Sequence, residues 1–84
     1  MHALVNVFVE SHRMDEVVQA LSQIDEVEEC YEVTGEFDIV TLVAAEDIDK
    51  FGDILKNKIM KIPGVKSTVS SIILLAHKGP KCKI

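Results

Sequence analysis

The chain has 84 residues and a net charge of −5, and 48% of its residues are hydrophobic. Its length allows one small domain, and its acidity argues against direct binding to nucleic acid. No apolar run approaches the roughly 20 residues that a membrane span requires, so neither a membrane protein nor a membrane partner is expected. A domain of this size removes only about 60–65% of its surface from water, so we expect the surplus of apolar side chains to form a subunit interface.

The first part of the chain predicts a strand followed by a helix. Residues 3–10 form the strand, in which apolar side chains point to both sides. Ser11 is placed to cap the helix, whose early turns carry Asp15 and Glu16 near the positive end of the helix dipole. The apolar residues of this helix recur at helical spacing and form one stripe: Met14, Val17, Val18, Leu21 and Ile24.

Residues 27–33 and 37–44 predict two further strands joined by a turn. In the first of these, Val27, Tyr31 and Val33 share one face, and the opposite face is polar and acidic, as expected for an edge strand. In the second, both faces are apolar, which predicts a strand at the centre of the sheet.

A second helix and a last strand complete the predicted domain, residues 1–77. Glu46, Asp47 and Asp49 open the helix, and Pro63-Gly64 ends it. Its apolar stripe consists of Ile48, Phe51, Leu55, Ile59 and Ile62. Residues 65–77 predict the strand, and residues 78–84 a flexible tail.

This order of elements predicts an α+β fold of the ferredoxin-like type, βαββαβ. Right-handed crossovers place both helices on one face of an antiparallel sheet with strand order 4-1-3-2. The helix stripes need only one sheet face, yet three strands carry apolar side chains on both. Burying one aliphatic side chain contributes about 1.5–3 kcal/mol, so the second face predicts a dimer of stacked sheets, a dimeric α+β barrel.

The turn between the second and third strands is the candidate binding site. Gly35 permits a tight turn at positive φ, which leaves backbone N–H groups beside the carboxylate of Asp38. These groups could hold the carboxylate and the ammonium of a free amino acid. The same residues could equally form only a stable hairpin, because Asp often accepts hydrogen bonds from nearby backbone in turns. The residues alone leave both interpretations open.

Two short motifs carry a resemblance to a known family. The turn reads Thr34-Gly35-Glu36-Phe37-Asp38, and Ile62-Pro63-Gly64-Val65 leads into the last strand. Over about residues 1–77 the chain resembles the ligand-binding domain of the Lrp/AsnC family, the RAM domain of feast/famine regulators, which is named for regulation of amino-acid metabolism. Phe37 stands where the family often has tyrosine. Family regulators also carry an N-terminal helix-turn-helix, so the chain is similar to stand-alone members that bind no DNA by themselves.

The resemblance implies an oligomeric amino-acid sensor without enzymatic activity. It implies a homodimer of facing sheets, assembly of dimers into a higher oligomer such as an octamer, and an amino-acid effector bound between dimers. It places the effector on Thr34, Gly35, Phe37 and Asp38, and on Thr68 and Ser70 of a neighbouring subunit. Full-length Lrp/AsnC regulators are the expected further partners, and no cofactor is implied.

Two other classes of protein fit the pattern less well. An ACT domain also senses amino acids, but it usually has a Pro-Gly loop after its first strand, where this chain reads Glu10-Ser11-His12-Arg13. A small enzyme of the dimeric α+β barrel type would need a cavity with convergent polar groups, and the first strand offers only Asn6 and Glu10. No base is evident that would activate Ser67, Thr68, Ser70 or Ser71, so catalysis is not expected.

The cysteines and histidines predict no metal centre. Cys30 and Cys82 form no C-x-x-C motif, and the absence of a disulfide framework or signal peptide favours the cytoplasm. His2 and His77 would be neighbours if the last strand ran antiparallel to the first, and Cys82 could approach them. This set lacks the spacing of a ligand motif, so we expect no bound metal.

Overall fold

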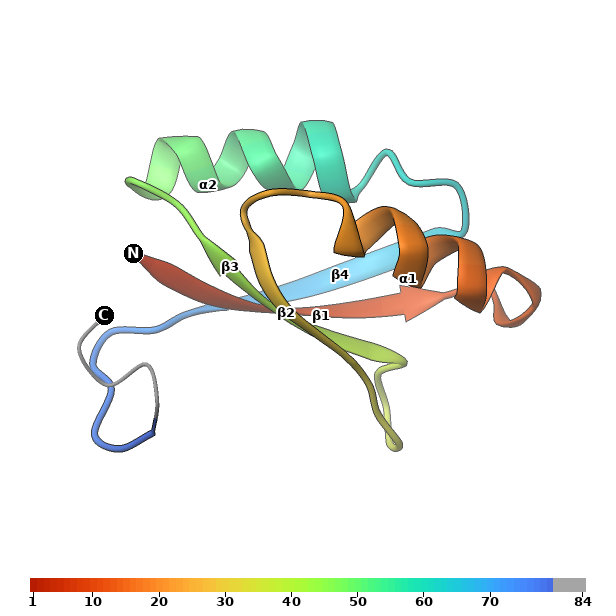
Figure 1. Ribbon diagram of the computed structural model, residues 1–84, viewed down its shortest axis with the longest axis horizontal. Helices are drawn as coiled ribbons and strands as arrows, with labels where there is room; N and C mark the ends of the chain where they lie inside the picture. Colours follow the sequence, from red (N-terminus) through yellow and green to blue (C-terminus); the bar gives the residue numbers. More distant parts are fainter. Residues whose placement is uncertain (80–84) are drawn as a thin grey trace.

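The computed structural model describes residues 1–79 and shows a four-stranded sheet with both helices on one face (Figure 1). The elements in chain order are β1 (His2–Val9), the 3-10 turn η1 (Ser11–Arg13), α1 (Met14–Ser22), β2 (Val27–Glu32), β3 (Ile39–Ala44), α2 (Ile48–Ile54), the π-helical turn η2 (Leu55–Ile59) and β4 (Val65–Ile72).

The sheet has the predicted topology. Its strand order is β2-β3-β1-β4, and every neighbouring pair is antiparallel. β1 and β3 are therefore the central strands, and β2 and β4 lie at the edges. The residue patterns predicted the places of β2 and β3, and the strand order predicted those of β1 and β4. Val5 of β1 lies opposite Thr41 of β3 and Ser70 of β4, which fixes which residues share a face.

The core lies between the sheet and the helices. Val5 and Val7 of β1 and Ile39 of β3 are fully buried there, against Val17 and Leu21 of α1. The remaining buried members of this cluster are Ala3, Val9, Val43, Phe51, Ile54 and Ile59. The helical stripes predicted for α1 and α2 thus serve to cover one face of the sheet.

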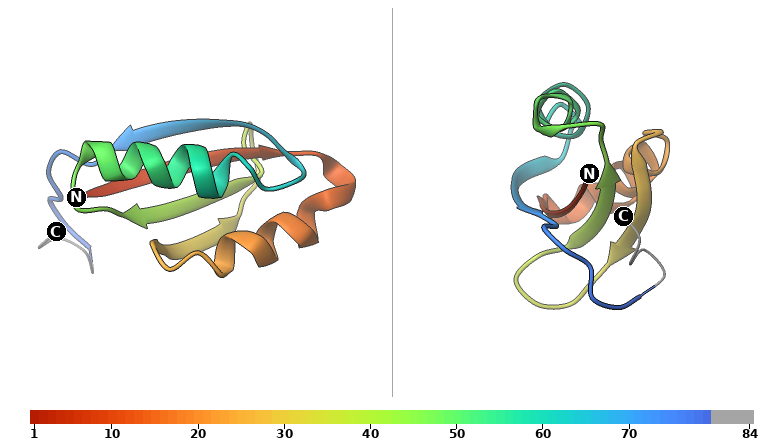
Figure 2. Two further views of the ribbon diagram at one scale, coloured as in Figure 1. Left: turned by 90° about the horizontal axis from the view of Figure 1, so that it is seen from above. Right: turned by 90° about the vertical axis from the view of Figure 1, so that its left-hand side faces the viewer.

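The other sheet face, which we call the open face, carries no helix (Figure 2). On this face Leu4 is 40% exposed and Val69 is 48% exposed. Leu4 alternates with the buried residues of β1, and Val69 follows Thr68 in β4, whose side chain points to the opposite face. The β2–β3 turn and the segment after β4 both bend away from the sheet on this side (Figure 1). The open face is therefore an apolar surface that the described chain leaves uncovered.

The start of the first helix differs from the prediction. Ser11 opens the 3-10 turn, and the α-helix itself begins at Met14, with Arg13 at the N-cap position and no side-chain capping bond. The Arg13 N–H donates instead to the Glu10 carbonyl, so a backbone turn occupies the place where a serine cap was expected.

The face assignment for the second strand was wrong beyond Val27. A β-bulge lies between Val27 and Glu29, so one extra residue reverses the alternation. Val27 therefore packs against the core, whereas Tyr31, opposite Val40, points to the open face. Cys30, predicted on the polar face, packs against the core instead.

The third strand is shorter than predicted because Phe37 leaves it. The ladder begins only at Ile39, and the Phe37 ring lies 4.8 Å from the ring of Phe8 between centroids. This aromatic contact stabilises the position of the turn on β1. Phe37 thus belongs to the turn and not to the alternating pattern of the strand.

The second helix changes geometry after two turns. The Met60 N–H donates to the Leu55 carbonyl over five residues, at 2.8 Å, which is the bond of a π-helical turn. The stripe is nearly as predicted, with Phe51 and Ile59 buried, but Ile48 is largely exposed at the first turn.

The last strand ends five residues earlier than predicted. Ile72 pairs with Ala3, and the Ile73 N–H donates to the His2 carbonyl, after which β1 has no further residue to pair with. Leu74, which follows, is 93% exposed. Most of the predicted tail, residues 80–84 with Cys82, lies outside the described residues.

The turn at Gly64, which follows the second helix, lies close against the first helix. Its φ is +101°, and a Cβ at this position would come within 2.8 Å of the Arg13 Cβ and 2.9 Å of a Val17 methyl. Its carbonyl also accepts a hydrogen bond from the Glu10 N–H. The helical segment already ends at Ile59, so Pro63-Gly64 does not end it as predicted; Gly64 instead permits a close backbone approach in the turn that follows.

Candidate functional site

The β2–β3 turn has the backbone conformation expected of a binding turn. Gly35 adopts a φ of +112°, and a Cβ there would meet nothing within 4 Å. Two hydrogen bonds hold the turn: the Val33 N–H donates to the Asp38 carbonyl, and the Asp38 N–H donates to the Val7 carbonyl. The N–H groups of residues 34–37 take no part in these bonds, and residues 34–36 are exposed. The turn thus offers unused N–H donors at the surface.

The Asp38 carboxylate has a structural role inside the chain. Its Oδ2 accepts a hydrogen bond of 2.8 Å from the Val9 N–H, at the register shift between β1 and β4. Such a charge-assisted bond ties the turn to the end of β1. The sequence suggested Asp38 as a ligand residue, but nothing in it indicated this internal partner, which lies 29 residues earlier.

The candidate residues of β4 lie apart from the turn within one chain. Thr68 pairs with Val7 and Ser70 with Val5, so both side chains are on the helix-covered side of the edge strand. β1 separates β4 from β3 and the turn. The structure therefore brings Thr34, Gly35, Phe37 and Asp38 together, but it does not bring Thr68 and Ser70 to them. The two groups can share a site only if a second subunit supplies one of them.

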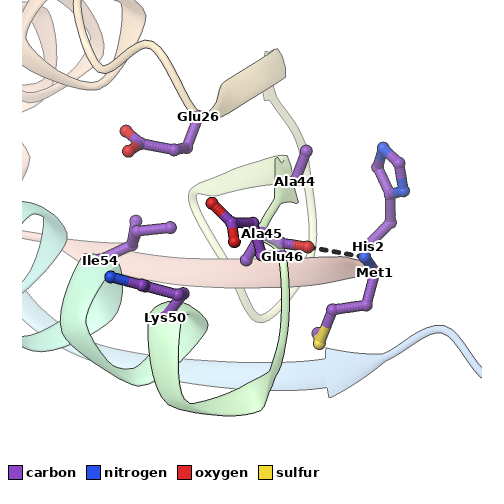
Figure 3. A pocket seen from close by; sticks show the side chains of 8 residues that line it. All are labelled: Met1, His2, Glu26, Ala44, Ala45, Glu46, Lys50 and Ile54. Carbon is purple, nitrogen blue, oxygen red and sulfur yellow. Dashed lines mark hydrogen bonds between the residues drawn. The ribbon is translucent and has the colours of Figure 1, made fainter.

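A cavity of about 520 Å³ lies at the opposite end of the sheet from the turn (Figure 3). Its apolar wall includes Ala45 and Ile54, and its charged side chains are Glu26, Glu46 and Lys50. The N-terminal ammonium of Met1 also lines it and donates to the Ala45 carbonyl at 2.6 Å. A volume of this size is within the range of small-molecule sites. No sequence pattern indicated it, because the residues come from β1, the loop before β2, the end of β3 and α2.

An ion pair borders this cavity. The Lys58 ammonium donates to both oxygens of Glu26 at 2.9 Å. These hydrogen bonds hold the pKa of the Glu26 carboxyl below its ordinary value, so it stays ionised at neutral pH. The pair joins the end of η2 to the start of β2.

The histidines and cysteines assemble no metal centre in the described chain. Within residues 1–79, no group of three or more His, Cys, Asp or Glu side chains is placed to hold a metal ion. His2 contacts Glu28 through Nε2 at 2.9 Å, and Cys82 of the proposed set lies outside the described residues. The Cys30 thiol is half-buried, and desolvation is the main cause that raises its pKa and keeps it protonated.

The His2 ring has one buried polar atom without a partner. Among residues 1–79, its Nδ1 accepts or donates no hydrogen bond. His2 lies opposite Ala44, on the side of the open face. Buried polar atoms normally have a partner, so this atom is an exception within the described chain.

Comparison with known proteins identifies the family. The model of the Lrp/AsnC ligand binding domain matches residues 2–81. The HTH-type transcriptional regulator Ptr1 of Methanocaldococcus jannaschii is 29% identical over 83 residues, 98% of this chain and 56% of that protein. A homocitrate synthase of Sulfurisphaera tokodaii is 36% identical over 75 residues, 88% of this chain, but only 16% of the enzyme is covered. The chain thus spans about half the length of the curated regulator.

Solved structures agree with this match. TTHA0845 from Thermus thermophilus has a TM-score of 0.86 and 27% identity, covering 93% of this chain and 98% of that one. The feast or famine regulatory protein Rv3291c from M. tuberculosis, complexed with L-methionine, has a TM-score of 0.82 and 31% identity, covering 95% of this chain and 54% of that one.

The described helices add one further observation. None of them within residues 1–79 has both the length and the apolar character needed to cross a membrane.

The family match covers nearly the whole sequence, and it coincides with the ferredoxin-like fold, the Gly35 turn and the Pro63-Gly64 entry to β4. The chain belongs to the Lrp/AsnC ligand-binding domain family.

Proposed function

We propose that this chain is an amino-acid-binding and oligomerisation module that modulates transcription regulators of the Lrp/AsnC type. The observation that carries the proposal is the β2–β3 turn, which leaves N–H donors unused beside Asp38 in a domain whose family is defined by ligand binding. The L-methionine complex of Rv3291c supports an amino acid as the effector.

The turn residues divide the recognition of an amino acid between them. The N–H groups around Gly35 bind the ligand carboxylate, because a positive-φ turn directs successive donors to one point. Asp38 binds the ammonium through Oδ1, since Oδ2 is already held by the Val9 N–H. Phe37, fixed against Phe8, lies beside these groups and offers an apolar contact. Thr34 supplies a hydroxyl in the same turn.

One neighbouring subunit covers the open face, and a subunit of another dimer completes the site. Thr68 and Ser70 reach the turn only from a second copy, because β1 separates them from it within one chain. The exposed Leu4 and Val69 favour the stacked sheet of a partner over water on this face. The homodimer then assembles into a higher oligomer with the amino acid between dimers.

The module acts without catalysis and without its own contact to DNA. Its net charge of −5 opposes duplex binding, so an effect on DNA requires co-assembly with a full-length regulator in the cytoplasm. Ligand binding between dimers stabilises one assembly state and shifts the regulator by linkage.

Calorimetry with each of the twenty amino acids, combined with sedimentation velocity, tests this function. We expect at least one amino acid to bind and to shift the chain to a larger assembly. Asp38→Asn keeps an acceptor for the Val9 N–H but removes the charge that holds the ammonium, and we expect binding about tenfold or more weaker.

The control is Glu36→Gln, which removes an exposed charge from the same turn and leaves affinity unchanged. If no amino acid binds, or if Asp38→Asn and Glu36→Gln behave alike, the turn is only a hairpin. A gel-shift assay provides the second arm. Specific binding of the purified chain to duplex DNA at physiological salt would contradict the role of an indirect modulator.

A further inference from the structure

The cavity around Ile54 contains charges that the fold does not use. Figure 3 shows the charged ends of Glu26, Glu46 and Lys50 turned toward the space around Ile54. Glu26 is neutralised by Lys58, which donates to both of its oxygens. Within residues 1–79, neither the Glu46 carboxylate nor the Lys50 ammonium has an ion-pair partner.

The helix start explains why these two charges stay apart. A Glu four residues before a Lys would normally pair with it on a helical surface. Glu46, however, precedes the helix, and Asp47 at the N-cap has extended backbone angles of φ −157° and ψ −179°. The Asp47 side chain accepts a hydrogen bond of 2.8 Å from the backbone N–H of Lys50, and this bond fixes the conformation. Glu46 is thus turned off the helical surface that carries Lys50.

We propose that this cavity is a second ligand site, specific for a small zwitterion: a free amino acid with an apolar side chain. Its ammonium binds Glu46 and its carboxylate binds Lys50, so that the ligand bridges two opposite charges that do not meet each other. With Glu26 paired to Lys58 and the Met1 ammonium donating to the Ala45 carbonyl, Glu46 and Lys50 are the two side-chain charges of the cavity, one of each sign, that have no ion-pair partner within residues 1–79, which suits a ligand that itself carries one charge of each sign. The apolar side chain lies against Ala45 and Ile54.

This site differs from the turn in what completes it. The turn requires a neighbouring subunit, whereas one chain supplies both charges and the apolar wall of the cavity. It lies at the start of β1 and the end of β3, and the turn lies at the other end of both strands. A ligand here contacts the elements that hold α2 on the sheet, and it needs no oligomer to bind.

Nuclear magnetic resonance can distinguish the two sites in the full chain. The Ile54 δ1 methyl signal reports the cavity, and the Gly35 amide signal reports the turn. Each of the twenty L-amino acids is titrated alone, together with n-butylamine and butyrate, which each carry only one of the two charges. The variants are Lys50→Met and Glu46→Gln, with Lys56→Met and Asp49→Asn as controls that change exposed charges outside the cavity.

We expect an apolar amino acid to shift the Ile54 methyl saturably, with butylamine and butyrate at least tenfold weaker. Lys50→Met and Glu46→Gln should each weaken this shift about tenfold or more, and the two controls should leave it unchanged. Asp38→Asn should weaken only the response of the Gly35 amide.

Three results would overturn the second site. The first is an Ile54 methyl that none of the twenty amino acids shifts, even when the Gly35 amide responds; the proposed function would then stand alone. The second is a shift that survives Lys50→Met and Glu46→Gln. The third is butylamine or butyrate binding as tightly as the amino acid. A cavity response without any response of the turn would support the second site and count against the turn.

Discussion

The two faces of the sheet are built from the same strands but differ in what covers them. On the covered face, Val5 and Val7 are fully buried under the two helices. On the open face, their neighbour Leu4 is 40% exposed, and Val69 and Tyr31 are also exposed. Alternation along β1 therefore separates a core that one chain completes from an apolar surface that it does not complete.

This difference indicates where folding ends and assembly begins. The covered face gains its stability from burial within the chain, at about 25 cal/mol for each Å² of apolar surface. On the open face, Leu4, Tyr31 and Val69 stay exposed until a partner covers them. The turn between β2 and β3 and the segment after β4 both extend on that side of the sheet (Figure 1).

The largest expected effect comes from placing a charge on each face in turn. Val5→Asp buries an unpaired carboxylate in the core and should abolish the folded state, because such a charge costs more than a small domain can absorb. Leu4→Asp, one residue earlier, should leave the circular dichroism spectrum folded and reduce the mass seen by sedimentation. A Leu4→Asp chain that keeps the wild-type mass would show that the open face is not an interface.

The sequence predicted this contrast of faces well, because the spacing of apolar residues reports which side of a strand is buried. It could not reveal the bulge after Val27, since one extra residue in a strand leaves no mark on composition or period. The end of β4 at Ile72 depends on where β1 begins, which is a property of the pairing and not of residues 73–77. The cavity charges at Glu46 and Lys50 depend on the extended conformation of Asp47, which also lies beyond periodicity.

Two of the positive-φ glycines, Gly35 and Gly64, sharpen the comparison at the next level. Both Gly64→Ala and Gly35→Ala force a Cβ into the left-handed region, which costs about 1–2 kcal/mol. Gly64→Ala also crowds Arg13 and the buried Val17 on the covered side, so we expect about 2–4 kcal/mol in total. Gly35→Ala meets no atom within 4 Å and should cost only the first amount. Urea unfolding of both variants measures the difference, and equal losses would contradict the close approach at Gly64.

The link between the turn and β1 gives a comparable but smaller effect. Asp38→Ala removes the acceptor of the Val9 N–H and should lower the free energy of unfolding by about 1.5–3 kcal/mol. Asp38→Asn retains an oxygen acceptor and should lose about 1 kcal/mol or less. Glu36→Ala, at the exposed tip, should stay within about 0.5 kcal/mol of the wild type. Urea unfolding without ligand tests this series, and an Asp38→Ala chain as stable as wild type would show that the bond is unimportant for the fold.

The ion pair between Glu26 and Lys58, which joins the helical layer to the start of β2, should have the smallest effect. Both side chains are partly exposed, so solvent screens the pair and its contribution is about 0.2–1 kcal/mol. Hydrogen bonds from Lys58 lower the folded-state pKa of Glu26 from its ordinary value of 4.5. The contribution is therefore fully present above pH 4.5 and is lost as the pH falls through the lowered folded-state pKa. Lys58→Met should lose stability at pH 7 but match the wild type in strong acid, and Lys56→Met is the control. A Lys58→Met deficit that persists unchanged in strong acid would mean that packing of the lysine stem, and not the charge of Glu26, is what stabilises this contact.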